Sequence, residues 1–204
     1  MKTRIFNLII IDESGSMEVI KQQAINSVNE TIQTIRAAQE RNENQEHFVT
    51  LVSFNDRAKT INDCAAIDNI QELTAESYQP DCCTALYDAM GMSLNALRKK
   101  VADIDKVLVT VVTDGYENAS QEYNLRTIKA LVEKLKTKGW VFAYLGANQD
   151  AEEVAFSMSI DNAMRWESTR EGTAYMSERL NYSRSRWYDE AATNSERIKG
   201  FFDE

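Results

Sequence analysis

The apolar positions of the chain follow two alternating patterns. Nearly continuous apolar runs predict strands at residues 4–11, 48–54, 106–113 and 140–145, with a last short strand at 162–166. Runs of this kind are typical of strands buried on both faces, as in a parallel sheet. Between them, apolar residues recur at helical spacing and predict helices at 17–38, 84–99, 121–137 and 150–158. This alternation predicts a Rossmann-like, doubly wound α/β fold: a mostly parallel six-stranded sheet with helices on both faces.

Three segments depart from the alternation. Residues 57–64 are more polar and follow the turn signal Asn55-Asp56, so we expect an antiparallel hairpin partner at the sheet edge. Residues 65–83 have no regular pattern. Residues 167–193 mix aromatic, apolar and charged side chains, Arg184 among the latter, and predict a core-packed final helix with a salt-bridged outer face. We therefore expect a single domain over 1–204, with a core at about 4–166 and a C-terminal helical segment at about 167–204.

Composition restricts where the protein acts and what it binds. The chain has 204 residues, 43% of them hydrophobic, and no apolar run near the roughly 20 residues that span a bilayer. Lys2 and Arg4 precede an apolar stretch, but Asn7 interrupts it and it ends at Asp12 without a small-residue cleavage site. We expect a cytoplasmic protein that does not bind membranes. The net charge of −9 disfavours nucleic acid as a partner, because phosphates must be met by basic surface.

The cysteines and the single histidine indicate no catalytic or zinc site. Cys64, Cys82 and Cys83 form neither a disulfide framework nor a zinc-binding spacing, and we expect small semi-buried thiols. His47 stands at a strand start, where a surface or edge position is expected. One histidine leaves little room for hydrolase mechanisms that need an imidazole base.

Acidic and hydroxyl side chains follow two of the predicted strands. The first strand ends in Asp12-Glu13-Ser14-Gly15-Ser16, and the run VLVTVV is followed by Thr113-Asp114-Gly115. In doubly wound sheets, ligands bind beyond the carboxyl ends of the strands, so both groups should face one crevice if the strands are neighbours. Carboxylate and hydroxyl oxygens are ligands for hard divalent cations. An acid that ends a buried strand also needs a partner.

Together with Thr84, these residues resemble the metal-ion-dependent adhesion site of the von Willebrand factor A domain. The motif of that family is Asp-x-Ser-x-Ser after the first strand, a threonine in a later loop, and an aspartate in a Thr-Asp-Gly turn. The matching residues are Asp12, Ser14, Ser16, Thr84 and Asp114. The order of elements also matches from residue 4 to about 166, and segments such as TDGYENAS resemble small intracellular bacterial and phage relatives.

The resemblance implies a site for Mg²⁺, or for Mn²⁺ or Ca²⁺. Its three hydroxyls would bind the cation directly, and its two aspartates directly or through water. One coordination position would stay open for a carboxylate of a partner protein. Glu13, Tyr116, Glu117 and Asn118 lie in loops expected at the rim of this site, as partner contacts or as solvated side chains.

Each residue of this site also has a plain structural explanation. Ser14, Ser16 and Thr84 could cap the helices that they precede, and Asp114-Gly115 could be an ordinary turn. One feature departs from the family: many relatives carry glycines before the threonine, where this chain has Cys82 and Cys83. A backbone with positive φ would tolerate cysteine poorly, so this departure concerns the loop that places Thr84 and not the other four residues.

The leading hypothesis is a protein-binding module without enzymatic activity. It rests on a ligand set that has no base or nucleophile beside it. A first alternative is a Mg²⁺-dependent phosphoryl-transfer enzyme with Asp12 as nucleophile, although Ser14 stands where such enzymes carry a second acid. A second alternative is a structural scaffold domain whose metal site is unused.

Overall fold

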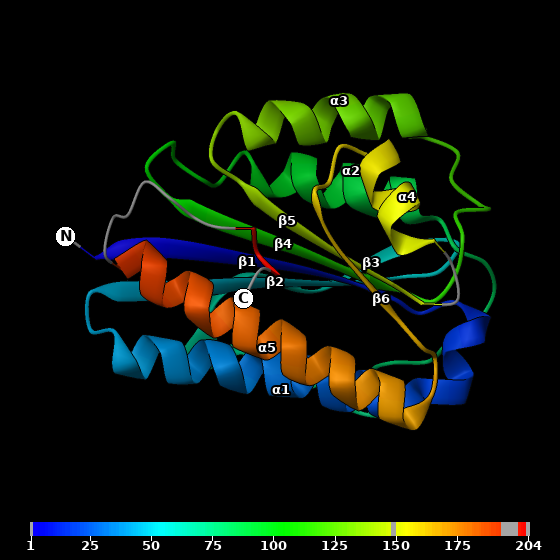
Figure 1. Cartoon of the computed structure of the whole chain (residues 1–204), viewed down its shortest axis with the longest axis horizontal. Helices are drawn as coiled ribbons and strands as arrows, with labels where there is room; N and C mark the ends of the chain where they lie inside the picture. The colour runs from blue at the N-terminus through cyan, green and yellow to red at the C-terminus, as the bar shows by residue number, and fades with distance from the viewer. Residues whose placement is uncertain (1, 148–149, 193–199, 203–204) are drawn as a thin grey trace.

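The computed structural model describes residues 2–147, 150–192 and 200–202, and its centre is a six-stranded sheet (Figure 1). The strand order is β3-β2-β1-β4-β5-β6. The strands are β1 (Thr3–Asp12), β2 (Gln45–Phe54), β3 (Ala58–Ala66), β4 (Lys106–Thr113), β5 (Val141–Ala147) and β6 (Asn162–Trp166). All neighbours pair in parallel except β2 and β3, which form the antiparallel edge. The fold class predicted from the hydrophobic pattern is confirmed.

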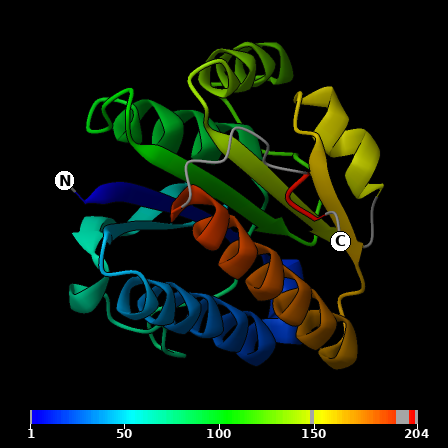
Figure 2. The ribbon, with the colours of Figure 1, turned by 60° about the vertical axis from the view of Figure 1, so that its left-hand side comes forward.

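Helices cover both faces of the sheet (Figures 1 and 2). α1 (Lys21–Arg41) and α5 (Arg170–Ala192) lie on one face, and α2 (Leu86–Leu97), α3 (Leu125–Lys136) and α4 (Ala151–Ser157) on the other. Short 3₁₀ helices, η1 (Gly15–Ile20) and η2 (Ile67–Asn69), complete the elements. Each face encloses its own apolar core, because the buried residues of the central strands alternate between the two layers. None of the described helices combines the length and apolarity needed to cross a bilayer.

The centre of the sheet is the point where the strand order reverses. β1 pairs with β2 on one side and with β4 on the other, and Ile11 stands opposite Val112 near the ends of β1 and β4. After β1 the chain therefore builds β2 and β3 on one side of it, and then β4, β5 and β6 on the other. Loops after two strands diverge at such a point, which opens space for side chains beyond the strand ends.

Two predicted helices begin later than expected. The segment predicted as helix from residue 17 opens with η1, which places Met17 and Ile20 three residues apart and buries both. Residues spaced by three lie above one another in a 3₁₀ helix, so the apolar pattern resembled the first turn of α1. α3 starts at Leu125 because Asn124 forms a capping box with Thr127.

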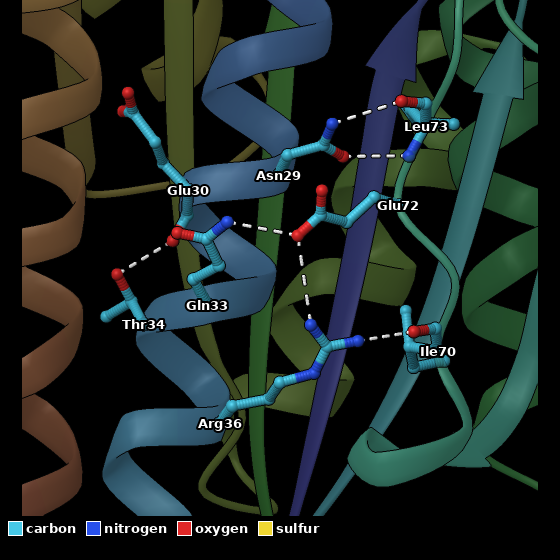
Figure 3. A network of polar contacts seen from close by, with 8 residues as sticks. All are labelled: Asn29, Glu30, Gln33, Thr34, Arg36, Ile70, Glu72 and Leu73. Atoms are coloured by element: carbon cyan, nitrogen blue, oxygen red, sulfur yellow. Dashed lines mark hydrogen bonds and ion pairs between the residues drawn. The ribbon is translucent and has the colours of Figure 1, made fainter.

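The irregular segment after η2 is held against α1 by reciprocal hydrogen bonds (Figure 3). The Asn29 amide donates to the Leu73 carbonyl at 3.0 Å and accepts from the Leu73 N–H at 2.8 Å. Arg36 donates to the Ile70 carbonyl and pairs with Glu72 at 3.8 Å. These contacts satisfy backbone groups that no strand or helix would pair. The segment then leads to Tyr78, whose hydroxyl donates to the Asp12 carbonyl at the end of β1.

One charged residue of the final helix, Arg184, lies in the core and not on the salt-bridged outer face that the pattern predicts for charged residues. Its side chain is fully buried between α5 and the sheet and donates to the Thr110 hydroxyl at 2.6 Å and to Asn7 Oδ1 at 3.4 Å. The Tyr188 hydroxyl donates to the same Asn7 oxygen. Asn7, the one polar residue inside the first apolar run, is thus one of the sheet residues that bind α5.

The expected surface position of His47 is wrong. Its side chain is fully buried under α5, edge-on to the Tyr188 ring at 4.7 Å between ring centres. Nε2 lies 3.0 Å from Gln45 Oε1. Burial, and then the nearby Arg184 charge, lower the pKa of His47 from 6.5 to about 4. The imidazole is therefore neutral in the folded protein at neutral pH and packs as a core residue.

Acid should weaken the fold through His47. In the unfolded chain the imidazole takes up a proton below pH 6.5, whereas the folded protein resists protonation down to about pH 4. Stability from this residue is therefore complete above pH 6.5 and is lost as the pH falls toward 4, by up to about 3 kcal/mol. Urea unfolding of the wild type and of His47→Gln across this window measures it. The stability gap between the two proteins should change with pH, and a constant gap would contradict the prediction.

Candidate metal site

Asp12 ends β1 with its carboxylate fully buried. One oxygen accepts from the Ser14 N–H at 2.7 Å, and the other accepts from the Thr113 hydroxyl at 2.5 Å. Thr113 ends the neighbouring β4, so the two strand ends are joined through this carboxylate. The Asp12 carbonyl accepts from the Tyr78 hydroxyl at 2.5 Å.

The two serines of the first loop contact each other, and Ser16 also contacts the second aspartate. The Ser16 hydroxyl donates to Asp114 Oδ1 at 2.5 Å, and the Ser14 and Ser16 oxygens lie 3.3 Å apart. Ser14 stands at the N-cap of η1, yet its side chain makes no capping hydrogen bond. Capping therefore does not explain these hydroxyls in the structure. Ser14 and Asp114 are buried and Ser16 is exposed, so the oxygen cluster reaches the surface at Ser16.

The Thr84 hydroxyl lies close to the same cluster. A Cβ built on Gly115 would stand 3.3 Å from the Thr84 hydroxyl oxygen and 3.9 Å from that of Ser16. The N-cap of α2 is Ala85, so Thr84 does not cap this helix either. Asn118 holds Thr84 in place from both sides: its side-chain oxygen accepts from the Thr84 N–H at 2.9 Å, and its N–H donates to the Thr84 carbonyl at 3.0 Å.

The cysteines before Thr84 differ from their expected positions. Cys82 and Cys83 are exposed, and only Cys64 is half-buried. Cys82 adopts the left-handed backbone that glycine would take more readily, with φ of 63°. Its carbonyl accepts from the Gly15 N–H at 3.3 Å, which brings the loop against the Ser14–Ser16 segment.

Burial disfavours the charge on both aspartates. Desolvation raises the pKa of Asp12 from 3.8 to about 6, and the hydrogen bonds from Thr113 and Ser14 only partly oppose it. Asp114 likewise has a raised pKa through burial, opposed by its bonds to Ser16 and Ser168. In the part of the chain that the structure describes, neither carboxylate forms an ion pair with lysine or arginine.

These residues fit a divalent cation of the hard class. Two carboxylates and three hydroxyls converge, and hydroxyl and carboxylate oxygens suit Mg²⁺, Mn²⁺ or Ca²⁺. A cation would also supply the positive charge that the buried carboxylates lack. Among the described residues there is no group of three or more histidine, cysteine, aspartate or glutamate side chains suited to a metal. A cation here would therefore depend on the hydroxyls.

The four rim residues lie in two different settings. The buried Glu13 carboxylate accepts from the Gln79 N–H, and Glu117 accepts from the Tyr87 N–H at the start of α2, at 2.9 Å. Both carboxylates therefore hold loops together. Asn118 is exposed but positions Thr84. The Tyr116 side chain is 58% exposed, which leaves it available for contact.

Three contacts of the aspartates were not predicted from the sequence: that of Thr113, whose hydroxyl was expected only to face the crevice, and those of Tyr78 and Ser168. The position of Thr113 could have indicated its contact, because a hydroxyl at the end of a buried strand, directly before Asp114, needs a polar partner near the strand end. Tyr78 and Ser168 lie in loops far from the aspartates in sequence, where spacing carries no information.

The chain matches the sequence model of the von Willebrand factor type A domain over residues 8–191. A search of curated proteins finds no relative. Similar solved structures include the PilB minor pilin from Streptococcus sanguinis, with 12% identity, a TM-score of 0.61, and coverage of 92% of this chain and 63% of that chain. The pilus adhesin SpaC from Lactobacillus rhamnosus GG has 11% identity, a TM-score of 0.67, and coverage of 92% and 30%. The ArnB paralog VWA2 from Sulfolobus acidocaldarius has 15% identity, a TM-score of 0.59, and coverage of 89% and 45%.

These identities are low, so the structural likeness shows the fold alone. The chain spans less than two thirds of the length of each of these three proteins.

Replacing Asp12 by asparagine should stabilise the metal-free protein at neutral pH. The folded pKa of about 6 exceeds the unfolded value of 3.8, so the stability that Asp12 contributes is complete below pH 3.8 and is lost as the pH rises through 6. The asparagine side chain has no charge to bury and keeps an acceptor for Ser14. We expect Asp12→Asn to raise the free energy of unfolding by up to about 3 kcal/mol at neutral pH. Denaturant unfolding in chelator measures this, and an equal or lower stability of the variant would contradict it.

Proposed function

Because this chain belongs to the von Willebrand factor type A domain family, we propose that it is a protein-binding module that recognises an acidic side chain of its partner through a divalent cation. The family match supports the protein-binding part of this proposal, since such domains generally serve protein interaction. Recognition through a divalent cation is supported by one observation: the Ser16 hydroxyl contacts Asp114 beside the Ser14 and Thr84 oxygens.

The composition of the site favours an anionic ligand. Ser14, Ser16 and Thr84 would bind the cation through neutral oxygens, and Asp12 and Asp114 would bind it directly or through water. Because three of the five ligands would be neutral hydroxyls, the bound ion would stay more electrophilic than in a site made of carboxylates alone and would attract a further carboxylate. Ser16 is exposed, which supports access from that side. When bound, the cation supplies a coordination position for the partner.

The other residues of this end hold the site in shape. Thr113 orients Asp12 through its hydroxyl, Asn118 positions Thr84, and Glu13 and Glu117 fasten their loops. Tyr116, with its exposed ring, is the rim residue that we propose contacts the partner.

The similar structures are consistent with a binding role. One is named as a minor pilin and another as a pilus adhesin, and this chain matches only part of each. No finding supports the phosphoryl-transfer alternative. The residue two positions after Asp12 is Ser14, which contacts Ser16 and cannot act as a general acid at neutral pH.

Metal-stripped protein should bind one Mg²⁺ or Mn²⁺ ion per chain, and added acetate should increase the affinity by completing the coordination. Isothermal titration measures both effects. The double variant Ser14→Ala/Ser16→Ala should lose the binding because it removes two neutral ligands. Ser185→Ala, on α5 outside the site, should bind as the wild type does.

Failure of the wild type to bind either ion, with and without acetate, would overturn the metal-dependent proposal. Binding that survives in the double variant would place the ion elsewhere.

Asn118→Ala should weaken Mg²⁺ binding without unfolding the protein. It removes the acceptor for the Thr84 N–H, which is a supporting contact of a proposed ligand. Supporting contacts of this kind are worth about 10- to 100-fold in metal affinity. Asn118→Asp keeps an acceptor and should recover most of the loss. Titration of both variants, with circular dichroism as the folding control, distinguishes positioning of Thr84 from general damage. Equal affinity of Asn118→Ala and wild type would contradict this role.

A further inference from the structure

Cys82 and Cys83 form an exposed pair of thiols next to the candidate metal site. Both side chains are exposed, and the Cys82 thiol lies 3.3 Å from the Cys83 sulfur and donates to it. Thr84 follows directly. The third cysteine, Cys64, lies half-buried on β3 and has no thiol partner among the described residues.

The backbone of this pair is part of the site's framework. Cys82 has a φ of 63°, in the left-handed region that a residue with a side chain adopts only at an energetic cost. The surrounding bonds hold it there: its carbonyl accepts from the Gly15 N–H at 3.3 Å, and its N–H donates to Asp81 Oδ1 at 2.7 Å. A Cβ on Gly15 would stand 3.5 Å from the Cys82 oxygen, so the two segments are close packed.

We propose that Cys82 and Cys83 are a site of reversible oxidation by peroxides, at which a disulfide between the two neighbours forms and lowers the affinity of the adjacent site for its divalent cation. The proposed disulfide is inferred only from the positions of the two thiols. Its effect on cation affinity rests on the function proposed above.

The chemistry balances with one peroxide molecule. One cysteine sulfur attacks a peroxide oxygen and becomes a sulfenic acid, and the other oxygen leaves as water. The second sulfur then attacks the sulfenic sulfur, an S–S bond forms, and the hydroxyl leaves as a second water. The two thiols lose two protons and two electrons, and hydrogen peroxide is reduced to two molecules of water. A dithiol reductant reverses the step by thiol–disulfide exchange.

Covalent geometry explains why this bond would disturb the site. A disulfide needs an S–S distance of about 2.05 Å, and the two Cα atoms usually lie at least about 4.4 Å apart. Neighbouring Cα atoms are only about 3.8 Å apart, so the strain must pass into the backbone. That backbone contacts Gly15 through the Cys82 carbonyl and continues into Thr84. Strained, exposed disulfides are also the more easily reduced ones, which suits a reversible modification.

The test treats fully reduced wild type, Cys82→Ser, Cys83→Ser and the matched control Cys64→Ser with hydrogen peroxide. We expect wild type and Cys64→Ser to lose the mass of two hydrogen atoms in the peptide that holds residues 82 and 83. Their Mg²⁺ affinity should fall about 10- to 100-fold, as for other disturbed supporting contacts, and should recover with dithiothreitol. Cys82→Ser and Cys83→Ser should show neither the mass loss nor a reversible fall in affinity.

Sulfinic acids or disulfides between chains, in place of the internal link, would overturn the proposed modification. An internal link that leaves Mg²⁺ affinity unchanged would overturn its effect on the site. If reduced wild type bound no cation at all, the proposed function would fail, but the mass readout would still decide the modification. Amide hydrogen exchange at Gly15 and Thr84 would then report the coupling, since the link should speed exchange at both positions and unchanged exchange would refute it.

Discussion

The buried carboxylate of Asp12 is the constraint on which this end of the molecule depends. It is the last residue of the central strand β1, whose apolar residues are buried on both faces of the sheet. No basic side chain of the described chain neutralises its charge. Burying such a charge is costly unless donors or a counter-ion surround it. The structure surrounds it with donors from β4 and from the loop after β1, and its own carbonyl receives the Tyr78 hydroxyl. The remaining deficit is positive charge, which a cation would supply.

The loops around this carboxylate are joined to one another rather than to the sheet alone. Asn118 and Thr84 exchange two hydrogen bonds, and Glu117 accepts from the N–H of Tyr87. Asp88 accepts in turn from the N–H groups of Gln121, Glu122 and Tyr123. The loop after β4 and the start of α2 therefore form one unit. Any ligand that contacts Tyr116 would act on a segment that is already connected to Thr84.

The sequence was informative where one physical demand dominates each position. Buried parallel strands need apolar residues on both faces, so β1, β4 and β5 were evident, and the strand ends placed Asp12 and Asp114 at one edge. It was uninformative where the partner is remote in sequence. Nothing near Asn7 or His47 indicates that α5 covers them, and the pattern did not distinguish Arg184 from the other charged residues of α5. Backbone conformation at Cys82 also contradicted its residue type, because packing against Gly15 overrides local preference. Whether these five residues hold a metal stays a prediction.

The long connection between β1 and β4 has a consequence for how the protein folds. Asp12 and Thr113 are 101 residues apart in sequence, and Ser16 and Asp114 are 98 apart. Contacts between such distant residues close a large loop and form slowly, because the entropy of that loop is lost before the contacts repay it. We therefore expect the oxygen cluster to form late in folding, after the central strands have paired. A ligand specific for the cluster would then bind only molecules in which both central strands are in place, and so would report completed folding.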